Sequence, residues 1–262
     1  MVSGAALNRP LVGRLQALAP QQRRPRVGPI SRLFHRSVRW AVRQLLIPYW
    51  QPLIEGDQHI PVSGPLLVAC NHPTVVDPLF VVVLFPRQLD LLMNKGVRGI
   101  PMFGRLFHEG GHVTTGPGCL EECLERLRLG YAVGVFPEGQ HSYSDQLGEF
   151  HKGISVLAKS SGAPVLPMGM LGHQNYLSPR ASYLRGGPVR VGIGPALRCE
   201  PEESAEDFTQ RLRHAVQGQM REVASPLPWQ PNWHFRLLQA VWVPVSWSLF
   251  KVIDRMKPDN IR

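Results

Sequence analysis

The sequence predicts an α/β fold: a mixed, largely parallel sheet flanked by helices, with amphipathic helices near both ends of the chain. From residue 65 onward, short apolar runs alternate with segments of helical periodicity. Two of these runs end abruptly in polar turns, one carrying His72 and the other Glu138. Because the carboxyl ends of parallel strands meet at one edge of a sheet, we expect both turns at the same edge.

Five apolar runs are typical of strands, and the segments between and after them have helical periodicity. The expected strands are residues 65–70, 89–94, 131–136, 163–170 and 189–194. The expected helices lie near residues 78–85, 99–107, 118–129, 150–161 and 204–223. The helix over 118–129 has one apolar face and a glycine stop at Gly130, and Ser204 is the expected cap of the last helix.

The composition limits the class of protein. The chain has 262 residues, of which 44% are hydrophobic, so it can bury a core and is not disordered throughout. Its formal charge of +10 indicates an anionic partner, either a membrane surface, a nucleic acid or a phosphorylated substrate. No nucleic-acid-binding motif accompanies the charge, so we expect no nucleic acid. The four cysteines contain no Cys-x-x-Cys pair and fit a reducing, cytoplasmic compartment.

The chain divides into four segments. Residues 1–29 are rich in arginine and proline and predict a disordered basic tail. Residues 30–54 predict a basic amphipathic helix, which either lies in the headgroup layer of a membrane or packs on the domain. Residues 55–225 form the α/β domain. Residues 226–262 hold four of the six tryptophans among cations, a pattern typical of a membrane interface, although a docked helix would bury the same side chains.

No stretch reaches the roughly 18 to 20 apolar residues that a membrane-spanning helix needs. The N-terminus also lacks the apolar core of a secretory signal. We therefore expect a peripheral protein on the cytoplasmic face of a membrane.

The turn from Asn71 to Asp77 is the first candidate site. His72 and Asp77 each precede a proline, which pushes them out of helical conformation and favours a turn, with Asp77 as helix cap and Pro78 as first helical residue. A carboxylate folded back onto an imidazole suits general-base catalysis. No Gly-x-Ser-x-Gly elbow supplies a nucleophile, so the pair would activate a hydroxyl of a substrate. The alternative is an ordinary turn in which Asp77 only caps the helix.

The second candidate site is the turn Phe136-Pro137-Glu138-Gly139. Glycine allows a close approach of the backbone to a ligand, and the carboxylate beside it can bind a hydroxyl or hold another catalytic group. Further along, Lys152-Gly153 opens a helix, and residues 164–167 begin another strand.

In this order and spacing, the Asn71-His72 pair with Asp77, the turn at residues 136–139, and the Lys152-Gly153 and 164–167 blocks resemble the glycerolipid acyltransferase family. This family of His-x4-Asp acyltransferases includes the 1-acyl-glycerol-3-phosphate acyltransferases and tafazzin. The resemblance covers roughly residues 50 to 200. It implies an enzyme of phospholipid biosynthesis that acylates a lysophospholipid such as lysophosphatidic acid.

The resemblance also implies roles for individual residues. His72 would take the proton from the acceptor hydroxyl while Asp77 orients its ring, and the oxygen would attack the thioester of acyl-CoA or acyl-carrier protein. These are co-substrates, and no cofactor, metal or covalent enzyme intermediate is implied. Glu138 and Gly139 would bind the acceptor beside the base. Asn71 would either hold the turn or donate to the developing oxyanion.

The chain departs from the family pattern where arginines are expected to bind the phosphate of the acceptor. Residues 110–116 contain no arginine, and Gln140-His141-Ser142 stands where Thr or Ser and then Arg usually follow the Glu-Gly pair. Because phosphate needs charge and donors more than one residue type, several cations are candidate substitutes. They are Lys95, Arg98, Arg105, His141 and Lys152.

Two alternative functions stay open. The acceptor is another lysolipid, a glycolipid or an alcohol without a phosphate monoester, or the chain is a catalytically silent membrane-binding homologue. In the principal hypothesis, the partners are membrane phospholipids, the acyl donor and the lysophospholipid acceptor. His108 and His112 are four apart, but the glycines between them disfavour a helix, so no metal site is expected.

Overall fold

The computed structural model describes residues 52–74, 76–96, 112–142, 146–172 and 187–224, together with Trp40, Gln44, Trp50 and Ala240. In chain order, the elements are β1 (Leu53–Glu55), the 3-10 helix η1 (Asp57–His59), β2 (Leu66–Cys70), α3 (Asp77–Leu84), β3 (Leu89–Met93), β4 (Val113–Thr114), α5 (Cys119–Arg128), β5 (Ala132–Val135), α6 (Gly153–Ser161), β6 (Val165–Leu171), β7 (Arg190–Ile193) and α8 (Ala205–Glu222).

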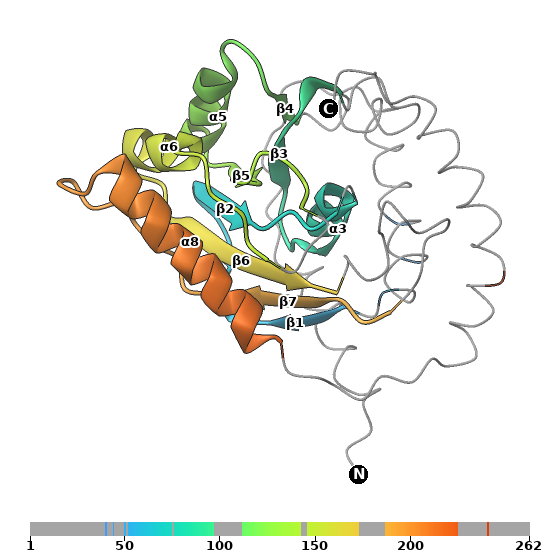
Figure 1. Ribbon diagram of the computed structural model, residues 1–262. Helices are drawn as coiled ribbons and strands as arrows, with labels where there is room; N and C mark the ends of the chain where they lie inside the picture. The colour runs from blue at the N-terminus through green and yellow to red at the C-terminus, as the bar shows by residue number, and fades with distance from the viewer. Residues whose placement is uncertain are drawn as a thin grey trace.

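The strands form one seven-stranded sheet in the order β1-β7-β6-β2-β5-β3-β4, with helices on both faces (Figure 1). β2 lies in the middle and pairs in parallel with β5 and β6. The pairs β3–β5, β3–β4 and β1–β7 are also parallel, whereas β6 and β7 run antiparallel. The predicted α/β class, with its mixed and largely parallel sheet, is confirmed.

The five expected strands correspond to β2, β3, β5, β6 and β7, and four of the expected helices to α3, α5, α6 and α8. The helix expected near 99–107 lies outside the described residues. α6 begins at Gly153 and not at Phe150, because Phe150 is a buried core residue and the next amide, of His151, donates to the carbonyl of Pro137 at 2.8 Å. β1 and β4 were not predicted.

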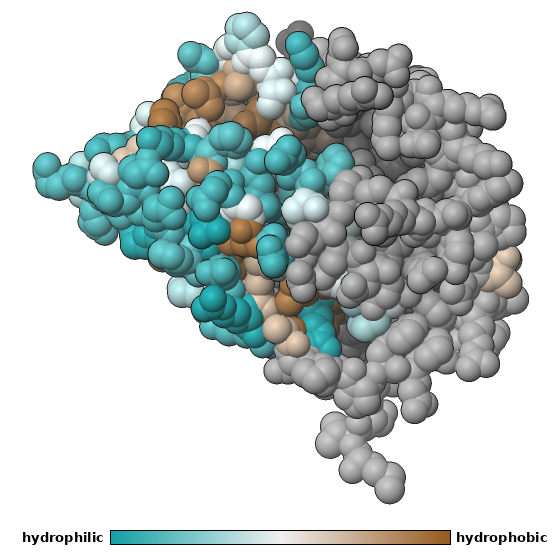
Figure 2. Space-filling model, viewed as in Figure 1, coloured by the Kyte–Doolittle hydropathy of each residue, from teal (hydrophilic) through white to brown (hydrophobic). Residues whose placement is uncertain are grey.

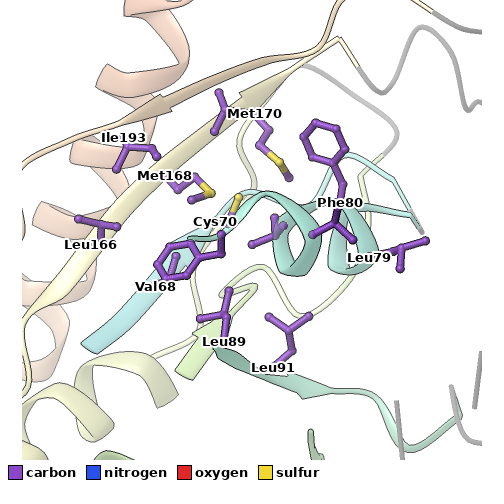
Figure 3. Close-up of a cluster of buried hydrophobic side chains, with 14 of the residues drawn as sticks. Val68, Cys70, Leu79, Phe80, Leu89, Leu91, Leu166, Met168, Met170 and Ile193 are labelled. Atoms are coloured by element: carbon purple, nitrogen blue, oxygen red, sulfur yellow. The ribbon is translucent and has the colours of Figure 1, made fainter. Parts of the chain in front are cut away.

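The sheet is buried on both faces, which explains the continuous apolar runs in its central strands. Side chains alternate along β2, so that Leu66, Val68 and Cys70 belong to the core on the α3 face. Figure 3 shows Val68 and Cys70 in this core. Leu67 and Ala69 face the opposite core, which α5, α6 and α8 cover. Each face of the sheet thus has its own hydrophobic core.

α8 approaches the sheet closely. A Cβ on Gly169 would lie 2.6 Å from the amide nitrogen of Met220, and a Cβ on Gly192 would lie 2.7 Å from the carbonyl oxygen of Gln219. Ser204 caps the helix as predicted, since its Oγ accepts a hydrogen bond from the amide of Asp207 at 3.1 Å. The outward surface of α8 is mostly hydrophilic (Figure 2), as its apolar residues face the sheet.

The expected basic tail of residues 1–29 lies outside the described residues, as do most of the helices expected over 30–54 and 226–262. Trp50, which is 1% exposed, packs edge-to-face on Phe80 with ring centroids 5.9 Å apart. The core therefore includes side chains that precede residue 55. None of the helices in the described ranges is long and apolar enough to cross a membrane.

Candidate active site

The two candidate turns lie side by side because their strands are neighbours. β2 leads into Asn71 and His72, and β5 leads into Phe136 and Glu138. The chain leaves β2 toward β3 and leaves β5 toward β6, which lie on opposite sides of this strand pair. Ligands of open α/β sheets bind where the chain diverges in this way, outside the carboxyl ends of the strands. The edge predicted from the sequence, at the carboxyl ends of β2 and β5, is therefore the expected position of a ligand site.

His72 and Asp77 are in contact, as predicted. Nδ1 of His72 lies 3.0 Å from Oδ2 of Asp77. The Asp77 side chain is fully buried, while the His72 side chain is 14% exposed. A carboxylate at Nδ1 favours the tautomer that carries its proton there, so Nε2 is left as the basic nitrogen. This is the arrangement that a general base requires.

The buried carboxylate of Asp77 does not cap its helix. α3 begins at Asp77 itself, Val76 occupies the cap position, and no side chain caps the helix. Oδ2 accepts from the amide of Thr74 at 2.6 Å, and Oδ1 accepts from the hydroxyl of Thr74 at 2.8 Å. The predicted cap role was wrong, because Thr74 and His72 already engage both oxygens. Thr74 was missed, although a threonine three residues before an aspartate is a known local pairing.

Glu138 connects three segments of the chain. Its Oε1 accepts from the amide of His72 at 2.8 Å, and its Oε2 accepts from the amide of Gly148 at 2.8 Å. The side chain is 6% exposed. These contacts hold the backbone of His72, a function that the sequence offered as one of two possibilities for this carboxylate.

Gly139 follows with φ of 71°, in the left-handed region that favours glycine. A Cβ at this position would lie 2.9 Å from two ring atoms of His151. The turn therefore needs glycine both for its backbone conformation and for the space beside His151.

Asn71 holds the turn against β6. Its Nδ2 donates to the carbonyl of Met170 at 2.9 Å, and its Oδ1 accepts from the amide of Met170 at 2.7 Å. Asn71 is 3% exposed. Its two side-chain hydrogen bonds continue the pairing of β2 with β6 beyond Cys70, where the strand pairing ends. Of the two roles considered for Asn71, these contacts favour the structural one.

Cys70, just before the turn, is not a competing nucleophile. Burial raises the pKa of its thiol well above the usual value, and the Asp77 and Glu138 carboxylates raise it further. The thiolate, which is the nucleophilic form, is therefore disfavoured.

Two aromatic side chains lie against the His72 ring. Phe136 stacks on it with centroids 4.2 Å apart, and His141 meets it edge-on at 5.7 Å. The amide of Ser142 donates to the carbonyl of His72 at 3.0 Å, so a backbone hydrogen bond holds the His141 loop beside His72. Of the candidate phosphate ligands, His141 is the one that the described structure brings to the His72 ring.

The other candidate cations are distributed differently. Lys95 is exposed just after β3, at the same edge of the sheet as His72. Lys152 forms an ion pair with Glu206 of α8. Arg98 and Arg105 lie outside the described residues. Within the described ranges, no group of three metal-ligating side chains gathers at this or another place.

A small apolar pocket lies on the α3 face of the sheet. Phe80 and Leu84 of α3, Met168 and Met170 of β6, and Ile193 of β7 are among the residues that line it. Figure 3 shows Phe80, Met168 and Met170 gathered on this face. The backbone of Met170 also pairs with the side chain of Asn71, at the start of the turn that carries His72.

Comparisons with known proteins point to one family. A family model described as Acyltransferase matches residues 51–171. The 1-acyl-sn-glycerol-3-phosphate acyltransferase of Pseudomonas aeruginosa is 34% identical over 182 residues, covering 65% of this chain and 69% of that protein. The chloroplastic enzyme LPAT1 of Arabidopsis thaliana is 29% identical over 177 residues, covering 63% of this chain and 49% of that protein. The chain spans about half the length of several of these relatives.

The fold has a solved counterpart in the crystal structure of the 1-acyl-sn-glycerophosphate (LPA) acyltransferase PlsC from Thermotoga maritima. The TM-score is 0.65 at 21% identity, over 76% of this chain and 82% of that one. At this identity the likeness shows the fold, and the family follows from the family model and the Pseudomonas relative. The chain belongs to the glycerolipid acyltransferase family, with the 1-acyl-sn-glycerol-3-phosphate acyltransferases among its relatives.

Proposed function

We propose that the chain is an O-acyltransferase of phospholipid biosynthesis that acylates a lysophospholipid, with acyl-CoA or acyl-carrier protein as donor. The observation that carries this proposal is the His72 imidazole, partly exposed, with a fully buried carboxylate at its Nδ1. That pair supplies a base with a defined tautomer. The thiol next to it, of Cys70, is disfavoured as a nucleophile because burial raises its pKa. The pair therefore suits a reaction whose nucleophile is a substrate hydroxyl.

In the proposed reaction, the acyl group passes directly from the thioester donor to the acceptor hydroxyl. Nε2 of His72 takes the proton of the acceptor hydroxyl as its oxygen attacks the thioester carbonyl. Asp77 stabilises the imidazolium that forms. The tetrahedral intermediate then collapses, the carbon–sulfur bond breaks, and the leaving sulfur takes up the proton from His72. An ester and a free thiol result, and the proposed chemistry uses no cofactor or metal.

The proposed acceptor is lysophosphatidic acid. Several relatives are named as 1-acyl-sn-glycerol-3-phosphate acyltransferases, which supports a phosphate-bearing acceptor. In this chain we assign the phosphate to the side of the base where His141 lies, 5.7 Å from the His72 ring, with Lys95 at the same sheet edge. Lys152 is a weaker candidate, because its ammonium already has Glu206 as a partner.

The presence of His141 at this position also favours a second class of acceptor, one without a phosphate monoester. A histidine carries a full charge only when protonated, unlike the arginine usual in the family. An acceptor without a phosphate monoester would not need that charge.

The composition of the chain supports a lipid substrate at a membrane. The net charge of +10 suits binding to anionic membrane phospholipids. We therefore place the protein peripherally on the cytoplasmic face of a membrane, with no nucleic-acid partner.

The deciding experiment measures thioester consumption by the full chain with acyl-CoA and with acyl-carrier protein, over a panel of acceptors. Lysophosphatidic acid, a lysophospholipid with a phosphodiester headgroup, and monoacylglycerol are compared, with the His72→Ala protein as control. We expect lysophosphatidic acid to be preferred and the control to be inactive. Equal turnover of monoacylglycerol would favour the second acceptor class. No turnover of any acceptor would favour the silent membrane-binding homologue.

A further inference from the structure

Arg213 of α8 binds two backbone carbonyls just before α6. Its Nε donates to the carbonyl of Gly148 at 2.8 Å, and one terminal nitrogen donates to the carbonyl of Leu147 at 3.0 Å. The side chain is 19% exposed. It also lies 3.4 Å from Glu149, but that carboxylate is 78% exposed, so solvent weakens the ion pair. The two carbonyls are therefore the main partners of Arg213. Its guanidinium carries a rigid fork of donors that can bind both carbonyls at once.

The segment that Arg213 binds also forms a hydrogen bond with Glu138. The amide of Gly148 donates to Oε2 of Glu138, and the other oxygen accepts from the amide of His72, both at 2.8 Å. A Cβ on Gly148 would lie 2.8 Å from Oε2, closer than real Cβ contacts allow. The absence of a side chain at this position thus lets the amide reach the carboxylate. A continuous chain of hydrogen bonds runs from Arg213 to the backbone of His72.

Arg213 lies on a helix that packs closely against the sheet and against α6. α8 lies almost directly on the sheet at Gly169 and Gly192. It is also tied to α6 by the hydroxyls of Ser155 and Thr209, which are 2.6 Å apart and buried. A guanidinium on such a helix has a well-defined position relative to the strand ends.

His72 is therefore held from both faces of the sheet. Asp77, at the start of α3, fixes the ring from one face. Arg213 belongs to α8, which lies on the opposite face of the sheet from α3 (Figure 1). From that face it acts on the backbone of His72 through Gly148 and Glu138. A shift of the backbone of His72 would move its ring away from Asp77 and from the reacting hydroxyl.

We propose that Arg213 is a positioning residue for the His72 base, acting through Gly148 and Glu138 from outside the matched family region. The inference rests on the proposed function of His72. Because misplacing a base slows the chemical step more than it weakens substrate binding, loss of Arg213 lowers kcat and leaves KM nearly unchanged.

The test compares Arg213→Lys and Arg213→Ala with the matched changes at Arg211. Arg211 lies on the same helix and donates to the Glu203 carboxylate and to the carbonyl of Arg198, at 2.6 to 2.8 Å. These hydrogen bonds do not lead to Glu138. We expect Arg213→Lys to lower kcat about tenfold with both KM values within about twofold. Arg211→Lys leaves kcat within about twofold, whatever its effect on Tm. Equal kcat values for the two lysine variants would overturn the proposal.

A second measurement does not depend on turnover. Amide hydrogen exchange at His72 and Gly148 reports directly on the two bonds to Glu138. We expect faster exchange at both amides in Arg213→Lys and wild-type exchange in Arg211→Lys. Unchanged exchange at His72 would overturn the inference even if kcat falls. If the wild type turns over no acceptor, the proposed function fails, and exchange still decides whether Arg213 positions His72.

Coupling to Glu138 completes the test. If Arg213 acts through Glu138, the double variant Glu138→Gln with Arg213→Lys should lose little more activity than Glu138→Gln alone. Effects on kcat that multiply would mean independent action, and would contradict the proposed route. The lysine variant keeps the charge and most of the side chain, so it serves if the alanine variant does not fold.

Discussion

Asp77 and Glu138 are two buried carboxylates at one edge of the sheet, and they serve His72 in different ways. Asp77 binds the imidazole ring and both donors of Thr74. Glu138 binds two backbone amides, those of His72 and Gly148. One carboxylate therefore favours one tautomer of the ring and holds its orientation, while the other holds the backbone that carries the ring.

The difference teaches that the carboxylate close in sequence contacts the ring of His72, while the distant carboxylate contacts its backbone. Asp77 is five positions from His72, whereas Glu138 is 66 positions away, on another strand end. Replacing each acid by its amide should separate these two contributions, because the amide keeps the size of the side chain and removes one acceptor oxygen.

Removing His72, the proposed base, should give the largest loss of kcat, and the losses from changing either carboxylate should be smaller. His72→Ala should lower kcat by about 10³- to 10⁴-fold, because proton abstraction from the acceptor is lost. Initial rates of thioester consumption and a thermal melt measure activity and folding together. Wild-type turnover by a folded His72→Ala protein would place the base elsewhere and end the comparison.

The ring-holding carboxylate should give the next largest effect. In Asp77→Asn, the amide group favours the tautomer with a proton on Nε2, which cannot accept one from the hydroxyl. We expect kcat to fall by about 10²- to 10³-fold, with KM little changed. The measurement is a full kinetic profile with saturating donor. A loss no larger than that of Glu138→Gln would mean that the two carboxylates do not differ as described.

The backbone-holding carboxylate should matter less to the chemistry. Glu138→Gln leaves one amide facing an NH₂ donor, so we expect kcat to fall about tenfold and stability to fall by about 1–3 kcal/mol. Kinetics and denaturant melts check both numbers. A raised acceptor KM with unchanged kcat would instead support the acceptor-binding role that the sequence suggested.

The smallest effect should come from Thr74→Val. This change removes the hydroxyl bond to Asp77 but keeps the amide bond, so only one of the two Thr74 contacts is lost. We expect about 1 kcal/mol of lost stability and a rate within about fivefold of wild type. A rate loss as large as that of Asp77→Asn would show that the hydroxyl, and not the carboxylate alone, sets the ring tautomer.

Sequence patterns were sufficient for the central strands and for the His72–Asp77 contact. Each central strand is a continuous apolar run, and prolines after both residues force the turn that joins them. β4 was missed because Val113–Thr114 is too short to show a periodicity. The antiparallel direction of β7 has no sequence signal either, since a buried strand has the same composition in both directions.

The rest of the site depends on partners that composition cannot reveal. Gly148 contributes a backbone amide, which any residue but proline has, and its need for glycine appears only once Glu138 lies against it. Lys152 was expected near the acceptor on charge alone, but its partner, Glu206, is 54 positions away on α8. Long-range contacts of this kind require the fold before they can be predicted.

The pairing of Asn71 with Met170 has a consequence for how the protein folds. The two residues are 99 positions apart, so the turn that carries His72 cannot take its final form until β6 has docked on β2. Closing such a long loop is slow compared with forming helices and local turns. During refolding, activity should therefore return with the last phase of sheet assembly, well after the helical signal. A nascent chain on the ribosome would stay inactive until β6 has emerged.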